Sequence, residues 1–250
     1  MGADFVAASP ADGYTLLEVA SGYVLARALQ GLPFDANKNM APIAMVSSSL
    51  LFLFSSKKAL PNVRTLNDFL DYAKTNSQRK LPYGSNGIGS TTHLAMILIE
   101  KKFNLNLNHV PYKGTSQYTI DFLAGDLVAM VDSLTANAAY VKAGQTVPLM
   151  VLLPQRTNLL PDVPTARELG HPELEVIASH GIAAPAGTPR AIVDRLSAAI
   201  KQSLAEPEVE RVISVGNGVM YLDPSQYAES LNETYTKWGK VIRDNNIKAE

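Results

Sequence analysis

The chain has 250 residues, 46% of them hydrophobic, and its 22 basic and 23 acidic residues give a formal net charge of −1. This size and composition suit one large or two small globular domains, and the balanced charge, without a run of Lys or Arg, argues against a nucleic-acid partner. Cysteine is absent, which excludes disulfides and thiolate zinc sites. The longest apolar run, residues 49–54, is too short to span a bilayer.

Short β-rich runs alternate with helical periodicity along the chain, which predicts α/β layers with mostly parallel strands. The expected strands are residues 14–19, 41–48, 50–54, 127–131, 148–153 and 175–184. Helix-start signals stand at Thr65, at Thr188-Pro189 and at Asp223-Pro224, each before an apolar stripe with helical spacing. Tyr14, in the first expected strand, is interpreted as a core residue.

Residues 83–94, YGSNGIGSTTHL, combine three glycines with small hydroxyl residues and lead into an apolar helix. The G-x-x-x-x-G-S-T spacing is that of a phosphate-binding P-loop, but Ser90 replaces the required lysine, so we exclude a nucleoside triphosphatase. A dinucleotide site is excluded too, because Thr92 replaces the third glycine and no strong strand is expected before the loop. Two interpretations stay open: backbone N–H groups that bind a modest anion such as a carboxylate, or a plain helix cap.

Catalytic and metal chemistry find little support in the sequence. No G-x-S-x-G elbow and no H-E-x-x-H motif occur, and the four histidines are scattered. We interpret His93, on the helix after the glycine loop, as a structural hydrogen-bonding residue. Asp132 follows an apolar strand, where α/β proteins place ligand groups, but a cap for the next helix explains it equally well. The sequence therefore predicts no catalytic residue, no metal and no cofactor.

Five segments, in order along the chain, resemble one protein family. They are PADGYTLLEV, LPYGSNGIGSTTHLA, HVPYKGT, LPDVPTARELG and APAGTPRAIVDRL. Together they are similar to the tripartite tricarboxylate transporter substrate-binding receptors, the TctC or Bug family, over nearly the whole chain. The resemblance implies an α/β, two-lobed fold of the periplasmic-binding-protein type, a type II Venus flytrap. It also implies that the protein is no enzyme and that it closes on a small organic anion for delivery to a membrane permease.

The resemblance further implies which residues contact the ligand. In the second lobe they are Ser85, Asn86, Gly87, Gly89, Ser90, Thr91, Tyr112, Lys113, Gly114, Thr115, Asp132 and Ser133, and in the first lobe Ser21 and Gly22. Lys113 is explained equally well as a solvated loop lysine. His180 stands where the family usually carries an aromatic pair, and it either reads the ligand or packs as a neutral histidine.

Residues 1–54 and 174–250 are expected to form lobe one and residues 55–173 lobe two, with crossings near residues 50–54 and 175–181. Family members start with a signal peptide and a strand–loop–helix–strand unit that this sequence lacks. We therefore expect a first lobe that is incomplete at its N-terminus and self-associates. The function expected from the resemblance is a periplasmic receptor that binds a small carboxylate for a tripartite transporter. The alternatives are a truncated member without ligand binding, and a two-lobed enzyme or sensor.

Overall fold

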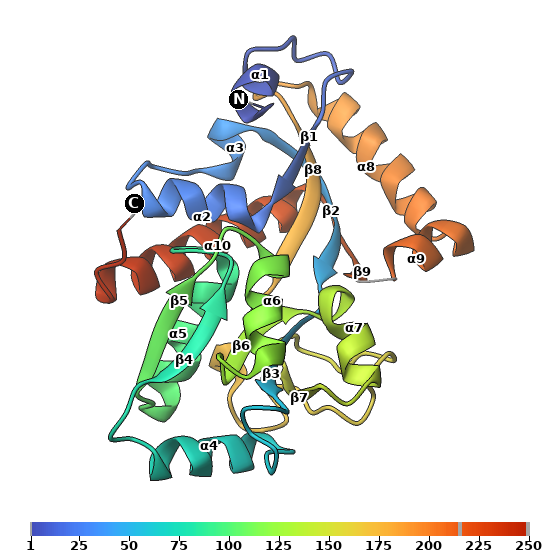
Figure 1. The fold of residues 1–250 in the computed structure, drawn as a ribbon. Helices are drawn as coiled ribbons and strands as arrows, with labels where there is room; N and C mark the ends of the chain where they lie inside the picture. Colours follow the sequence, from blue (N-terminus) through green and yellow to red (C-terminus); the bar gives the residue numbers. More distant parts are fainter. Residues whose placement is uncertain (1, 215–216, 249–250) are drawn as a thin grey trace. The chain divides into compact units, whose positions relative to one another are not determined.

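The computed structural model describes residues 2–214 and 217–248, which form two compact α/β units (Figure 1). The first unit runs up to Ser49 and again from Ala178 to Lys248, and the second from Leu50 to Ile177. Residues 50–54 and 174–177, which the sequence assigned to the first lobe, lie in the second unit. Residues 50–54 do so because β3 (Leu51–Ser56) pairs on both sides with strands of the second unit. In the other segment, the Val176 N–H donates to the carbonyl of Leu152, also in the second unit, at 2.8 Å.

The first unit contains a four-stranded sheet. Its order is β1 (Leu17–Ala20), β8 (Ala178–Ala184), β2 (Ala41–Ser49) and β9 (Asn217–Leu222). All neighbouring pairs run antiparallel, so the expectation of mostly parallel strands is wrong here. The path of the chain explains this: it leaves the unit after Ser49 and returns at Ala178, and these two residues pair, so that β8 runs back along β2.

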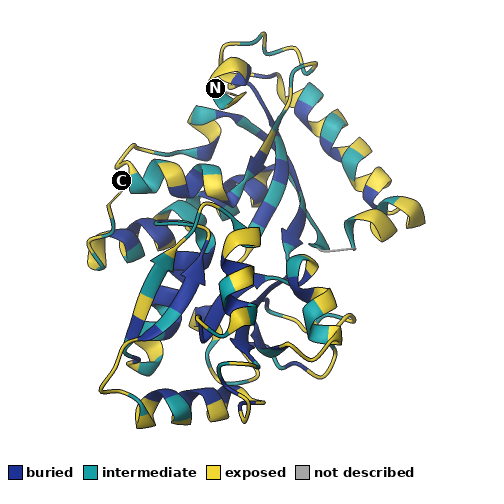
Figure 2. Cartoon of the chain, viewed as in Figure 1, coloured by how far each residue is buried: buried dark blue, intermediate teal, exposed yellow. Residues whose placement is uncertain are grey.

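Helices cover both faces of this sheet. They are α1 (Gly2–Ala7), α2 (Ser21–Leu29), α3 (Ala36–Asn39), α8 (Arg190–Leu204), α9 (Pro207–Ile213) and α10 (Pro224–Asp244). Successive residues of a strand point to opposite faces. Met45 accordingly packs in one cluster with Tyr227 and Leu231 of α10, whereas Ala44 packs in another with Val193 of α8. Buried residues, shown in dark blue in Figure 2, lie both on the strands and on the helix faces that pack against them.

The second unit contains a five-stranded sheet. Its order is β5 (Leu107–Pro111), β4 (Leu81–Ser85), β6 (Ala129–Ser133), β3 and β7 (Thr146–Val151). Here β4 runs parallel to β5 and β6, while β3 runs antiparallel to β6 and β7. The expectation that no strand precedes the glycine loop is wrong, because β4 does. Pro82 and Gly84 give this segment a low strand propensity, which pairing on both sides overrides.

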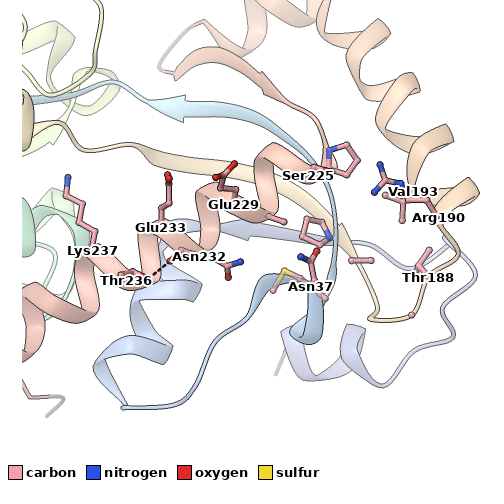
Figure 3. A pocket seen from close by; sticks show the side chains of 16 residues that line it. Asn37, Thr188, Arg190, Val193, Ser225, Glu229, Asn232, Glu233, Thr236 and Lys237 are labelled. Carbon is pink, nitrogen blue, oxygen red and sulfur yellow. Dashed lines mark hydrogen bonds between the residues drawn. The ribbon is translucent and has the colours of Figure 1, made fainter.

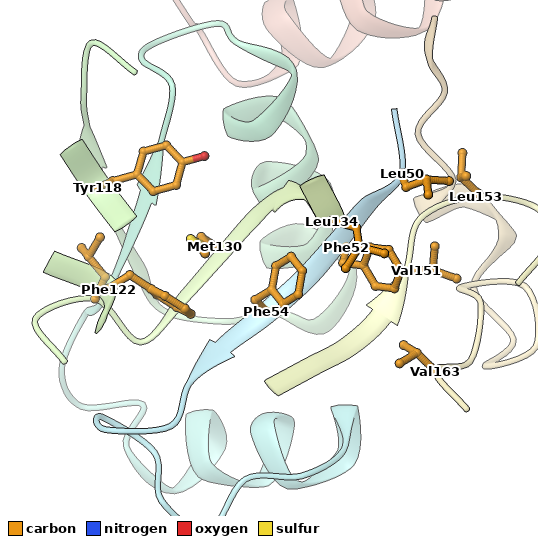
Figure 4. Close-up of a cluster of buried hydrophobic side chains, with 11 residues drawn as sticks. Leu50, Phe52, Phe54, Tyr118, Phe122, Met130, Leu134, Val151, Leu153 and Val163 are labelled. Carbon is orange, nitrogen blue, oxygen red and sulfur yellow. The ribbon is translucent and has the colours of Figure 1, made fainter. Parts of the chain in front are cut away.

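Helices α4 (Leu66–Thr75), α5 (Thr91–Phe103), α6 (Thr115–Ala124) and α7 (Leu134–Lys142) complete the second unit, with a short 3-10 helix at Pro172–Leu174. The chain moves from β4 to the neighbouring β5 through α5, and then back past β4 to β6 through α6. Right-handed crossovers in opposite directions place α5 and α6 on opposite faces of the sheet. On the α6 face, Phe52 and Phe54 of β3 pack with Phe122 and Met130 (Figure 4).

The helix-start signals at Thr65 and Asp223 are confirmed, since both residues form capping boxes. The interpretation of Tyr14 as a core residue is wrong: its side chain is 93% exposed. The strand begins only at Leu17. Before it, the carboxylate of Asp12 accepts the Tyr14 N–H at 3.0 Å. An Asp side chain that binds the backbone two residues on favours a turn over a strand, and Gly13 follows it in a left-handed conformation.

Candidate functional site

Three helices of the second unit begin at one edge of its sheet. Because β4, β5 and β6 are parallel, their carboxyl ends lie at the same edge, and α5, α6 and α7 start there. This is where open α/β sheets bind ligands. We call it the carboxyl edge. It brings together the predicted second-unit residues, namely Ser85, Asn86, Gly87, Gly89, Ser90, Thr91, Tyr112, Lys113, Gly114, Thr115, Asp132 and Ser133.

The glycine loop, residues 86–90, joins β4 to α5 and is held by its own hydroxyl groups. The Ser90 hydroxyl caps α5 by accepting the His93 N–H at 3.3 Å, and it donates to the Gly87 carbonyl at 2.7 Å. Gly87 and Gly89 have φ values of 103° and 74°, a region that favours glycine over residues with a Cβ. The helix-cap interpretation therefore describes what the Ser90 side chain does.

Some backbone N–H groups at the loop donate hydrogen bonds within the protein, and others, which we call open, have no acceptor among the described residues. The Asn86 N–H donates to Thr92 Oγ1 at 3.1 Å, and the Gly87 N–H donates to Ser85 Oγ at 3.1 Å. Among the described residues, no hydrogen-bond acceptor is found for the N–H of Thr91 or Thr92, the first two residues of α5. Such first-turn N–H groups carry partial positive charge and are suited to an anion. Capping by hydroxyls and anion binding by amides are thus compatible in one loop.

Side chains tie the loops of the carboxyl edge together. The Thr115 hydroxyl, at the start of α6, donates to Asn86 Oδ1 at 3.1 Å. The buried Tyr118 places its hydroxyl 3.5 Å from Thr115 Oγ1, and the same hydroxyl interacts with Asp132. Tyr112 is oriented differently, because its hydroxyl donates to Asp121 Oδ2 of α6 at 2.5 Å. The loops therefore form one connected rim.

Asp132 is the last but one residue of β6 and is buried, with 3% of its surface exposed. Its carboxylate accepts the Ser133 N–H at 2.7 Å and the Asn137 amide at 3.0 Å. Burial raises the pKa of Asp132, and these hydrogen bonds oppose the rise. Ser133 caps α7 by accepting the Ala136 N–H at 3.4 Å. Asp132 therefore holds the start of α7, and its direct contact with a ligand stays a prediction.

The predicted residues of the first unit lie at the β1–α2 junction and on β8. Ser21 is buried at the start of α2, and its hydroxyl accepts the Ser179 N–H at 2.7 Å. Gly22 is exposed in the first turn of α2. His180 is half-buried, with Nδ1 3.0 Å from Glu18 Oε1 and Nε2 3.0 Å from Ser49 Oγ. Their part in ligand binding stays a prediction.

A family model described as "Tripartite tricarboxylate transporter family receptor", TctC, matches residues 1–247. The chain belongs to this TctC family. A UPF0065 protein from Pseudomonas sp. strain P51 is 32% identical over all of this chain and 74% of its own length. Among solved structures, MatC from Rhodopseudomonas palustris with bound malate has a TM-score of 0.76 at 27% identity, covering 96% of this chain and 83% of its own.

A second R. palustris protein, in a structure with adipate, has a TM-score of 0.81 at 28% identity and covers 98% of this chain and 82% of its own. These matches establish the two-lobed fold of TctC receptors. The family consists of periplasmic solute receptors and not of enzymes. Over residues 2–214 and 217–248, the TctC chain has no helix with the length and apolar character that a membrane crossing requires.

One cavity of this TctC chain lies in its first unit. It measures about 880 Å³, and Figure 3 shows residues of α3, α8 and α10 around it. Asn37, Thr188, Arg190, Asn232 and Thr236 are among the residues that line it. None of the predicted ligand residues belongs to its wall. This cavity therefore gives no support to the predicted ligand residues, and the open N–H groups make the carboxyl edge the stronger candidate.

Sequence reasoning missed several residues of the candidate site. Tyr118 and Asn137 contact Asp132, and His109 contacts the Ser85 hydroxyl at 2.6 Å. Asn137 lies four residues after Ser133, one helical turn inside α7, so helical spacing could have indicated it. Tyr118 follows Thr115 by one turn in the same way. No local pattern predicts the contact of His109 with a residue on the neighbouring strand.

Proposed function

We propose that this TctC receptor binds a small organic carboxylate at the carboxyl edge of its second unit. The observation that carries the proposal is the pair of open N–H groups on Thr91 and Thr92, at an edge where α5, α6 and α7 all begin. The relatives with malate and adipate support a carboxylate as the ligand class. Anions are stabilised at helix N-termini by the helix dipole and by the unpaired amides.

Capture at this edge needs no charged side chain of its own. Lys113 is exposed on the loop before α6, and it adds a cation that a carboxylate can approach. Hydrogen bonds from the Ser133 N–H and the Asn137 amide offset part of the negative charge of the Asp132 carboxylate. The negative charge of a ligand is therefore balanced mainly by backbone dipoles. The mechanism is binding, without a chemical step.

Isothermal titration calorimetry with L-malate, adipate and the neutral diamide adipamide tests this proposal. We expect binding of at least one dicarboxylate and none of adipamide, because the amide dipoles favour a negative charge. Native mass spectrometry of the purified protein would identify a co-purified acid directly. Equal affinity for adipate and adipamide, or no binding of any carboxylate offered or co-purified, would refute the proposal.

We further propose that the chain works in the periplasm and hands its ligand to the membrane permease of a tripartite transporter. The family membership supports this partnership. The test is uptake of radiolabelled ligand by cells that carry or lack the receptor gene. Uptake that depends on both the receptor and the permease supports the role, and uptake unchanged by loss of the receptor contradicts it.

A further inference from the structure

We propose that His93 and His109 are positioning residues, which act as a stacked pair to hold the glycine loop in its anion-binding form. The expected effect on carboxylate binding rests on the proposed function. The structural part, that the two histidines hold the loop, stands without it. The sequence indicates a structural hydrogen-bonding role for His93 and no role for His109, whereas the stack gives His93 its partners and His109 a role.

The two imidazole rings lie face to face under the loop. Their centroids are 3.8 Å apart, with an angle of 12° between the ring planes. Tyr83 continues the stack, with its ring centroid 5.1 Å from that of His109 and an interplanar angle of 23°. Tyr83 and His109 are paired residues on the neighbouring parallel strands β4 and β5, and His93 comes from the first turns of α5. Three elements thus contribute to one stack.

Each histidine holds one of the two left-handed glycines. The Gly89 N–H donates directly to His93 Nδ1 at 3.0 Å. His109 Nε2 lies 2.6 Å from Ser85 Oγ, and this oxygen accepts the Gly87 N–H at 3.1 Å. Glycine has the largest conformational freedom of any residue, so a loop with two of them needs such contacts to keep a single form.

The hydrogen bond from the Gly89 N–H requires an uncharged imidazole at His93. An Nδ1 that accepts the Gly89 N–H carries no proton, so the proton of His93 lies on Nε2. Burial, and to a lesser extent the adjacent His109, lower the pKa of His93 to about 4. Burial also lowers the pKa of His109 to about 4. At neutral pH the pair therefore contributes hydrogen bonds to the loop and no positive charge to the ligand.

The competing explanation is that the rings only fill space in the core. Two substitutions at one position separate the explanations. His93→Phe keeps an aromatic ring in the stack but removes the acceptor for the Gly89 N–H. His93→Asn loses the ring but can place Oδ1 where Nδ1 stood. If the hydrogen-bond acceptor matters, His93→Asn keeps the native conformation of the glycine loop and His93→Phe loses it. If ring packing matters, His93→Phe keeps this conformation and His93→Asn loses it.

The experiment measures the affinity for L-malate and adipate by calorimetry, and the exchange rate of the Gly89 amide hydrogen by NMR without ligand. For His93→Phe we expect roughly five- to tenfold weaker binding and faster Gly89 exchange, the effect of one lost hydrogen bond. For His93→Asn, measured below the melting temperature of this variant, we expect an affinity and a Gly89 exchange rate close to those of the unaltered protein. Weaker binding and faster exchange in the Asn variant alone would overturn the proposal.

A measurement on the unaltered protein protects the test against variants that do not fold. The ¹⁵N spectrum of the imidazoles at neutral pH should show His93 with an unprotonated Nδ1 and a protonated Nε2. The opposite tautomer, or a charged ring, would overturn the proposal. If the unaltered protein binds no carboxylate, the proposed function fails, while Gly89 exchange and the tautomer still decide whether the histidines position the loop.

Discussion

The N–H group of Thr91 can be removed without changing the course of the chain. Thr91 is the first residue of α5, a position where proline is favoured because its N–H is not needed inside the helix. Ser90, which precedes it, is extended with φ −66° and ψ 159°, as a residue before proline should be. Thr91→Pro therefore deletes one proposed donor, while the Ser90 cap can remain.

A hydrogen bond to a charged group contributes roughly 1.5–3 kcal/mol, which corresponds to an affinity loss of about 10- to 150-fold. The Thr92 N–H stays in place, so we expect the loss in Thr91→Pro to lie near the lower end of this range. Thr91→Ala is the matched control, because it removes the hydroxyl and keeps the N–H. Its affinity should change by less than about threefold, since no hydrogen bond of the Thr91 hydroxyl is found among the described residues.

Calorimetry with the dicarboxylate that the unaltered protein binds, and thermal unfolding of each variant, give the answer. Both variants should unfold within about 1 kcal/mol of the unaltered protein, because neither changes the core. Wild-type affinity in a folded Thr91→Pro variant would refute the assignment of this N–H as a ligand donor. Equal losses in the Pro and Ala variants would show that the side chain matters and the amide does not.

Three further predictions concern stability and selectivity. Because the pKa of His93 is lowered in the folded protein, the unfolded chain binds a proton on this residue at a higher pH than the folded chain does. The free energy of unfolding should therefore fall as the pH drops from about 6.5 to about 4. The raised pKa of Asp132 opposes this trend, so the effect of His93 is checked by comparison with His93→Asn. The melting temperature of this variant should depend less steeply on pH than that of the unaltered protein, and equal slopes would contradict the prediction. Gly181→Ala should destabilise the fold by about 2 kcal/mol or more in urea unfolding, because its Cβ would lie 2.4 Å from Tyr227 Cζ, whereas Gly22→Ala meets no atom within 4 Å and serves as the control. Asp132→Ala should weaken binding of plain and hydroxy-dicarboxylates by similar factors, because it loosens the start of α7, and a loss confined to hydroxy acids would show direct contact with the ligand.

Elements with local signals could be predicted from the sequence, and long-range pairing could not. The caps at Thr65 and Asp223 depend on residues within one turn, and both are found. Strand β4 was missed because Pro82 and Gly84 give its sequence a low strand propensity, and the strand is stabilised by pairing with β5 and β6. The antiparallel sheet of the first unit was missed for a similar reason, since it depends on where the chain returns at Ala178.

The same distinction applies to the site. The residues of the glycine loop were identified from their order and type, and the bond from Gly89 to His93 spans four residues, within reach of helical reasoning. The contact between Ser85 and His109 spans 24 residues and two strands. It depends on the register of β4 against β5, which no sequence pattern specified. The hydrogen bonds of Ser90 and Thr92 also show that the hydroxyls hold the loop while amide groups stay open, which the sequence does not reveal.

An anion site made of backbone amides has consequences that a site made of Arg or Lys lacks. Amide dipoles are fixed by the helix starts, so binding orders few long side chains and loses little conformational entropy. Amides also do not titrate, and the neutral histidines below the loop add no charge at pH 7. Such a site recognises a carboxylate but not the rest of the molecule that carries it. Selectivity among acids must then come from the side chains around the edge, and Asn86, Lys113 and Thr115 are among the described groups there that keep accessible surface.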